Sequence, residues 1–123
     1  MQSKANPTCS VIIVTHNSQK HTPKLFDCLR KQTREANHIV VVDSFSKNTD
    51  YLKKLFYPNV LELSLQSENV GFCKGNNIGV ERVISKSDYI LFLNPDAFLT
   101  PTFLEKAIEK MDSKEYQDVA VIS

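Results

Sequence analysis

The sequence has few of the residues that build cross-linked, metal-stapled or nucleic-acid-binding domains. Its three cysteines, Cys9, Cys28 and Cys73, are too widely spaced for a disulfide framework or a zinc site, and a reducing, cytoplasmic setting is expected. Fifteen Lys and Arg against 14 Asp and Glu leave a net charge of +1, which excludes nucleic-acid binding through bulk positive charge. No apolar run approaches the roughly 18 residues of a membrane helix, and residues 1–7 are too polar for a signal peptide.

What is present is an alternation of apolar runs and helical patterns along one domain's length of 123 residues. Short β-branched runs predict buried strands, and Thr22-Pro23 and Thr100-Pro101 are typical of helix starts. Strands separated by helices of this length favour an α/β class with a mostly parallel, Rossmann-like sheet flanked by helices. The expected strands are 10–15, 38–43, 60–65, 89–93 and 119–122. The expected helices are one capped by Thr22 and beginning at Pro23, two at 50–56 and 74–85, and one from Thr100 through Met111.

Polar clusters follow three of the expected strands, at residues 15–18, 43–46 and 94–96. Ligands of open parallel sheets bind beyond the carboxyl ends of the strands, so these clusters indicate a site. Each cluster taken alone is explained equally well by residues that simply end strands. The three together favour a site.

The three glycines of the chain all fall between residues 71 and 79. Gly71 could supply a turn with positive φ, and the start of the following helix would attract phosphate. Gly75 and Gly79 would allow either a ligand or the sheet to approach that helix closely. Asn76 and Asn77 are poor helix formers and suggest side chains used for hydrogen bonding.

These segments together resemble the nucleotide-sugar-binding half of family 2 inverting glycosyltransferases, in particular the rhamnosyltransferase-like branch. The resemblance covers residues 9–123 and implies the N-terminal part of the glycosyltransferase type A fold. One such motif would be weak, but four in this order and at these spacings are specific. The motifs are Ser10-Val-Ile-Ile-Val-Thr-His-Asn-Ser18, Val41-Val-Asp-Ser-Phe-Ser46, Glu68-Asn-Val-Gly-Phe-Cys-Lys-Gly-Asn-Asn-Ile-Gly79 and Leu93-Asn-Pro-Asp96.

The resemblance also implies roles for individual residues. Asp43 would accept a hydrogen bond from N3–H of uracil or thymine, and Asp96 would hold Mg²⁺ or Mn²⁺ bridging the diphosphate. The glycine segment would lie against the ribose and diphosphate. The nucleotide-binding residues implied in this way are Thr15, His16, Asn17, Asp43, Ser44, Gly71, Lys74, Gly75, Asn76, Asn77 and Asn94.

Three departures from the family pattern stand out. His16 occupies a position where the family usually has tyrosine, and a catalytic role for it is not expected. The turn after Asp43 carries Ser44, Phe45 and Lys47 where a further Asn and a Gly are usual. Only Asp96 supplies a carboxylate in its motif, which suffices where phosphates and water complete the shell of Mg²⁺.

No residue after Asp96 matches the general base that an inverting transfer needs. The carboxylates there, which pair with lysines on a helix or surround a polar turn, are Glu105, Glu109, Asp112, Glu115 and Asp118. We therefore expect a tail at residues 1–8 and a nucleotide-sugar-binding domain at 9–123 that is truncated before the acceptor-binding half.

Two functional classes remain open. One is a transferase domain that binds a uridine or thymidine diphosphate sugar, dTDP-rhamnose among the candidates, for transfer to a glycan or lipid-linked acceptor in cell-surface polysaccharide synthesis. The other is a non-catalytic nucleotide-sugar-binding or scaffold module. No nucleic-acid partner is expected, while peripheral membrane association through the missing part and homo-oligomers are compatible with the resemblance. A phosphoacceptor receiver domain is disfavoured, because the first strand lacks the acidic pair after it.

Overall fold

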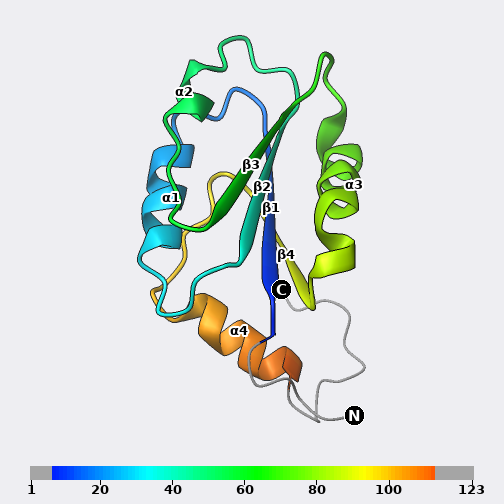
Figure 1. The fold of residues 1–123 in the computed structure, drawn as a ribbon. Coiled ribbons are helices and arrows are strands. Elements are labelled where there is room, and N and C mark those ends of the chain that lie inside the picture. The colour runs from blue at the N-terminus through cyan, green and yellow to red at the C-terminus, as the bar shows by residue number, and fades with distance from the viewer. Residues whose placement is uncertain (1–6, 113–123) are drawn as a thin grey trace.

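The computed structural model describes residues 7–112 as four strands with helices between them (Figure 1). β-Branched runs form the central strands because their side chains are buried on both faces. In chain order the elements are β1 (Cys9–Thr15), α1 (Thr22–Arg30), β2 (His38–Asp43), α2 (Asp50–Lys53), β3 (Val60–Leu65), α3 (Gly71–Val83), a 3₁₀ turn (Ile84–Lys86), β4 (Tyr89–Leu93) and α4 (Phe103–Asp112).

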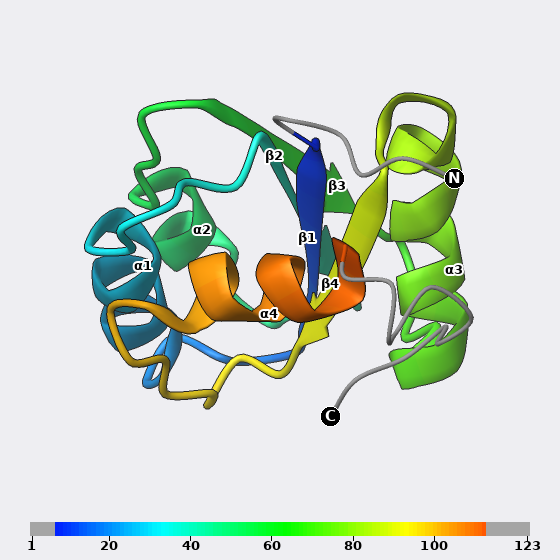
Figure 2. The same cartoon turned by 90° about the horizontal axis from the view of Figure 1, so that it is seen from below.

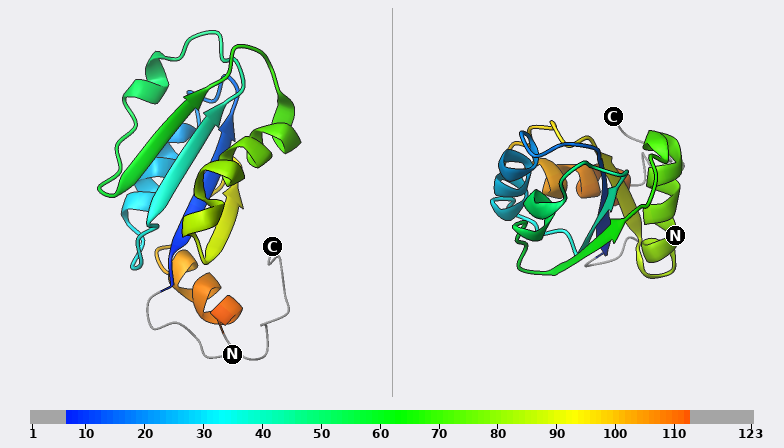
Figure 3. Two further views of the ribbon diagram at one scale, coloured as in Figure 1. Left: turned by 45° about the vertical axis from the view of Figure 1, so that its right-hand side comes forward. Right: turned by 90° about the horizontal axis from the view of Figure 1, so that it is seen from above.

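The four strands form one parallel sheet in the order β3-β2-β1-β4 (Figure 3). The chain proceeds outward from β1 to β3 and then crosses back to place β4 on the other side of β1. The strand order therefore reverses at β1, and the crevice beside its carboxyl end is where such sheets bind ligands. The register brings Thr15 beside Asp43 and Ile13 beside Leu93, so the ends of all three strands lie at one edge.

Helices cover both faces of the sheet, with α3 on one face and α1, α2 and α4 on the other (Figure 2). Alternate residues of β1 supply the two cores. Val11 and Ile13 pack with the α1 and α4 side chains, whereas Ile12 and Val14 pack beneath α3. The predicted α/β architecture with a parallel sheet and flanking helices is confirmed.

The glycines of α3 set its distance from the sheet. A methyl group on Gly75 would come within 2.9 Å of the Val14 side chain, and one on Gly79 within 2.5 Å of Cγ2 of Ile12. Cγ2 of a β-branched residue cannot swing aside as the tip of a long side chain can. Of the two uses that the sequence left open for this pair, the structure shows close packing of helix on sheet.

We expect Gly79→Ala to destabilise the fold by about 1–3 kcal/mol, because the added methyl overpacks the contact with Ile12. Helix propensity alone would stabilise the alanine variant by about 0.5–1 kcal/mol. The sign of the change in the free energy of unfolding therefore shows whether packing or propensity dominates. Urea denaturation of the single variants and of the Gly79→Ala, Ile12→Ala double variant measures this. Strictly additive effects in the double variant would contradict a direct clash.

Several element ends differ from those expected. Helix α1 begins at Thr22 with His21 as its N-cap, so the expectation that Thr22 caps this helix was wrong. α2 has four residues instead of the seven expected. α3 begins three residues early because Gly71, at φ +78°, turns the chain directly into the helix, and α4 begins at Phe103, after the Thr100-Pro101 turn.

The sequence predicts a tail at residues 1–8. Thr8, the last residue of that range, donates from its backbone N–H to the Asp88 carboxylate at 2.8 Å and is thereby held at the start of β4. The strand expected at 119–122 lies outside the described residues. Within residues 7–112 no helix combines the length and apolarity needed to cross a bilayer.

The three cysteines are free thiols, as the sequence predicted. Cys9 is buried in the core at the start of β1, and this burial raises the pKa of its thiol to about 11, with Arg34 opposing the shift. Cys9 is therefore a packing residue that stays protonated at neutral pH.

Candidate functional site

The centre of the carboxyl edge is the side chain of Asp43, which is 1% exposed. Its Oδ1 accepts hydrogen bonds from the hydroxyls of Thr15 and Ser46, both at 2.7 Å, and its Oδ2 accepts from the Ser46 N–H at 2.9 Å. The hydroxyl of Tyr51 lies 3.5 Å from Oδ1. These donors satisfy a charge that burial would otherwise make costly. Asp43 thus joins the end of β1 to the turn after β2.

This geometry bears on the predicted contact between Asp43 and the nucleobase. Both carboxylate oxygens already have partners within the fold, and almost none of the side chain reaches the surface. A base could reach Asp43 only if the turn opened. The structure therefore favours a positioning role for this residue.

Ser44 joins the same turn to the start of α3. The residue is 1% exposed, and its hydroxyl donates to Oδ1 of Asn69 at 2.7 Å. The Ser44 hydroxyl oxygen in turn accepts hydrogen bonds from the backbone N–H groups of Val70 at 2.8 Å and Gly71 at 3.2 Å. The ends of β2 and the beginning of α3 are thereby held together by one side chain.

The loop after β1 is bound to the turn after β2 as well. The ring of His16 donates through Nδ1 to the Ser44 carbonyl at 2.5 Å, since a carbonyl can only accept. The N–H of Asn17 donates to the Ser46 hydroxyl at 2.7 Å, and its side-chain oxygen accepts from the Lys47 N–H at 2.8 Å. Asn17 has φ +51°, a conformation that asparagine tolerates. His16 and Asn17 are exposed above the buried network.

The first turn of α3 offers backbone donors at this edge. Two of the N–H groups that a helix start leaves unpaired, those of Val70 and Gly71, are bound by Ser44 and Asn69. Within residues 7–112 the next two, of Phe72 and Cys73, have no partner. Such a helix start attracts anions, and the exposed Lys74 adds a cation beside it.

Gly75, Asn76 and Asn77 follow the first turn of α3 and differ in how far they are exposed. Gly75 faces Val14 and lies one turn inside the helix, which places it away from the free N–H groups. Asn77 is exposed, whereas Asn76 is partly buried and its Oδ1 has no hydrogen-bond partner in the described part of the chain. Of this segment, therefore, Gly71, Lys74 and Asn77 are accessible to a ligand, and Gly75 serves packing.

The loop after β4 contributes Asn94 and Asp96, both exposed. They belong to a turn closed by a hydrogen bond from the Ala97 N–H to the Asn94 carbonyl at 3.0 Å. The turn follows Leu93, which pairs with Ile13 beside the point where strand order reverses. Among residues 7–112 no three His, Cys, Asp or Glu side chains form a group that could hold a metal ion unaided. A single exposed carboxylate fits Mg²⁺ or Mn²⁺ only when phosphates complete the coordination.

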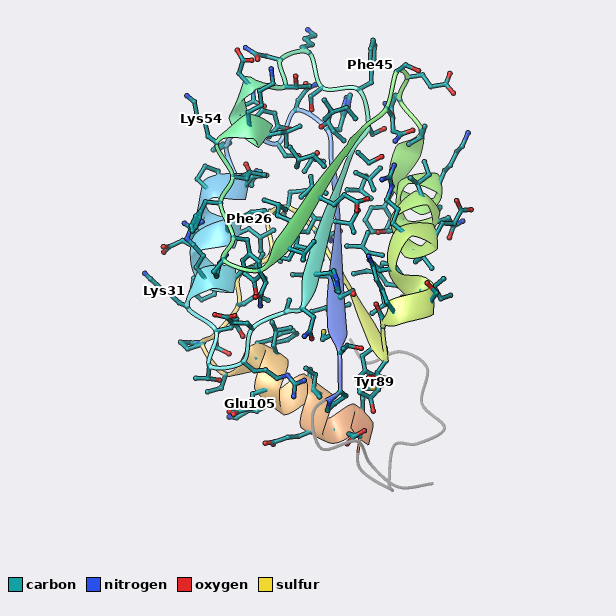
Figure 4. All side chains as sticks on the ribbon, viewed as in Figure 1. Phe26, Lys31, Phe45, Lys54, Tyr89 and Glu105 are labelled. Atoms are coloured by element: carbon teal, nitrogen blue, oxygen red, sulfur yellow. The ribbon has the colours of Figure 1, made fainter. Side chains whose placement is uncertain are left out.

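The acidic residues of α4 lie at the opposite end of the sheet. Figure 4 shows Glu105 near the amino ends of the strands and Phe45 at their carboxyl ends. Glu105 accepts from the Thr33 hydroxyl at 3.4 Å, and Asp112 accepts from the Tyr89 hydroxyl at 2.6 Å, where β4 begins. Both carboxylates therefore lie away from the carboxyl edge of the sheet. Glu115 and Asp118 lie outside the described residues.

Sequence reasoning missed the residues that brace the site. Ser46 lies in the polar cluster at residues 43–46 and Tyr51 in the short predicted helix, and neither pattern by itself indicates a role in the site. Both bind the Asp43 network, and the Tyr51 hydroxyl also accepts from the Ser18 N–H at 3.0 Å. The recurrence of small hydroxyl residues beside a strand-end aspartate was the available signal.

Comparison with known proteins agrees with this arrangement. The family model described as glycosyl transferase family 2 matches residues 10–122. The rhamnosyltransferase WbbL of Escherichia coli K12 is 32% identical in an alignment of 112 residues that covers 86% of this chain and 41% of that protein. The solved structure of Staphylococcus aureus TarS 1–349 in complex with UDP-GlcNAc superposes with a TM-score of 0.75 at 26% identity, covering 85% of this chain and 31% of that one.

The mannosyltransferase PcManGT from Pyrobaculum calidifontis, solved with GDP-Man and Mn²⁺, shares the fold with a TM-score of 0.80 at 19% identity, over 92% of this chain and 34% of that one. The chain spans between 20% and 41% of the length of the curated relatives it matches. Its sheet is that of the N-terminal part of the type A fold. Because the family model covers nearly the whole sequence and the fold agrees with it, the chain belongs to glycosyl transferase family 2.

Proposed function

We propose that this chain is the donor-binding part of a glycosyltransferase that takes a uridine or thymidine diphosphate sugar, together with a divalent cation, for inverting transfer to a hydroxyl group. One observation carries the proposal. Three polar strand ends and the free N–H groups of the α3 start meet at the edge where strand order reverses, in a chain of this family. TarS, solved with UDP-GlcNAc, supports a uridine-linked donor for this chain, and the rhamnosyltransferase WbbL supports a rhamnosyl donor such as dTDP-rhamnose, whereas PcManGT, solved with GDP-Man, shares only the fold.

Different exposed residues of the edge would bind the nucleoside, the diphosphate and the cation. The surface for the nucleoside comes from His16 and Asn17 above the buried pair Thr15 and Asp43. The first turn of α3 would receive the diphosphate through backbone N–H groups and Lys74. Asp96 would hold the cation, which when bound offsets the charge of the leaving nucleoside diphosphate.

Isothermal titration calorimetry of the purified chain tests this function. UDP and dTDP should bind in the presence of Mg²⁺ or Mn²⁺, and parallel titrations with ADP and GDP measure whether the site prefers a pyrimidine base. Lys74→Ala should weaken every diphosphate, whereas Lys110→Ala on α4 serves as a matched control far from the edge. Failure of a folded wild-type chain to bind any nucleoside diphosphate would overturn the proposal.

Binding and transfer should separate in this chain. The donor-binding residues are present at one edge, while the carboxylates of α4 lie at the other and no base has been identified. Incubation with dTDP-rhamnose or UDP-GlcNAc and a glycan acceptor should therefore release nucleoside diphosphate only at the background rate, under conditions in which calorimetry shows binding. Acceptor-dependent turnover would contradict this expectation and would assign the base to this chain.

A further inference from the structure

We infer that Phe45 is a platform on which the nucleobase of the donor stacks, so that this side chain contributes directly to donor affinity. The inference rests on the proposed function and adds a binding residue to it. It starts from the backbone: Phe45 has φ +60°, in the left-handed region. A bulky side chain is a genuine outlier there, and strain of this kind persists at functional sites when the surroundings enforce it.

Hydrogen bonds on both sides of Phe45 hold its backbone in the left-handed conformation. On one side, Ser44 is held through its N–H to the Thr15 carbonyl at 2.7 Å and through its carbonyl to the His16 ring at 2.5 Å. On the other side, Ser46 donates from both its N–H and its hydroxyl to Asp43. Both neighbours are buried, so the turn has no freedom to relax and Phe45 is directed outward.

The side chain itself gains little from the fold. Phe45 is 57% exposed and belongs to neither hydrophobic core. Figure 4 shows it pointing away from the sheet at its carboxyl end, between the segments that lead to α2 and α3. Among the large hydrophobic side chains exposed in residues 7–112, only Phe45 has a left-handed backbone. The left-handed backbone costs stability and the exposed ring returns little of it through burial, which points to a use outside folding.

The position of the ring suits a nucleobase. Ser44, the residue before Phe45, also binds the N–H groups at the start of α3, so the ring and the proposed diphosphate site are fixed to the same side chain. One nucleotide can therefore contact both places, its phosphates at α3 and its base at the ring. Base–aromatic stacking needs only a flat π face and is tolerant of base identity.

The decisive variant is Phe45→Gly, because affinity and stability should move in opposite directions. Glycine adopts positive φ without strain, so the free energy of unfolding should stay equal or rise. The affinity for UDP and dTDP should fall about five- to hundredfold, while the affinity for inorganic pyrophosphate should not change. Phe56→Gly is the matched control, since Phe56 is 54% exposed but accepts from Arg30 near the end of α1, and it should leave nucleotide affinity unaltered.

A second variant uses the absence of tryptophan from the chain. Phe45→Trp introduces a single indole at the platform, and its fluorescence should be quenched when UDP or dTDP is added but not when pyrophosphate is added. Full affinity in Phe45→Gly, or an indole that does not respond to a nucleotide that binds, would overturn the inference and leave the proposed function standing. A folded wild-type chain that binds no nucleoside diphosphate would overturn the proposed function itself.

Discussion

Replacing Asp43 by alanine is expected to destabilise the chain by about 3 kcal/mol or more and to weaken every nucleoside diphosphate alike. The change leaves the Thr15 hydroxyl and the N–H and hydroxyl of Ser46 without their acceptor in a buried site, and each such loss costs about 1–3 kcal/mol. The turn after β2 would lose its tie to β1. Urea denaturation and calorimetry with UDP, dTDP and GDP measure the two effects.

Two further variants make this result interpretable. Asp43→Asn keeps one acceptor oxygen but turns an NH₂ group toward a neighbouring donor, so it should be intermediate. Asp50→Ala, at an exposed carboxylate on α2 paired with Lys53 at 3.8 Å, should change stability by less than about 0.5 kcal/mol. If Asp43→Ala kept full stability and lost only the preference for pyrimidine nucleotides, Asp43 would contact the base directly, as the resemblance first implied.

Asp96→Ala is expected to abolish the cooperation between metal and nucleotide. With one exposed carboxylate in the loop after β4 and no group of three metal-ligating side chains within residues 7–112, the chain should bind Mn²⁺ weakly alone and far better once a diphosphate supplies further oxygens. A coupling of about 5- to 150-fold is typical of linked sites, and it must appear equally in the metal and nucleotide affinities. Titrating each ligand at fixed concentrations of the other measures it.

The control for Asp96 is Glu109→Ala, which removes an exposed carboxylate from α4 at the far end of the sheet. It should leave the coupling unchanged. Asp96→Ala should also leave the melting temperature of the ligand-free chain unchanged, because the side chain is exposed. Undiminished coupling in Asp96→Ala would show that the metal is held elsewhere.

The sequence by itself determined the class of fold and most of the sheet. The strands His38–Asp43, Val60–Leu65 and Tyr89–Leu93 have the bounds that their apolar runs predict, and the first strand begins one residue early. His38–Asp43 is decisive because a β-branched segment buried on both faces is typical of a central parallel strand, whereas the edge strand Val60–Leu65 alternates along its length and is only partly buried. The motifs at the strand ends, taken in order, likewise indicated the family that the family model then matched.

Only the tertiary structure decided what individual residues of the site do. Asp43 could face a ligand or the fold, and its burial depends on Thr15, 28 residues earlier in the chain. Gly79 could admit a ligand or the sheet, and the position of Ile12 decides for the sheet. The left-handed backbone of Phe45 follows from hydrogen bonds that hold both its neighbours. Local sequence preference cannot predict these three features, because each is set by contacts between segments that meet only when the sheet forms.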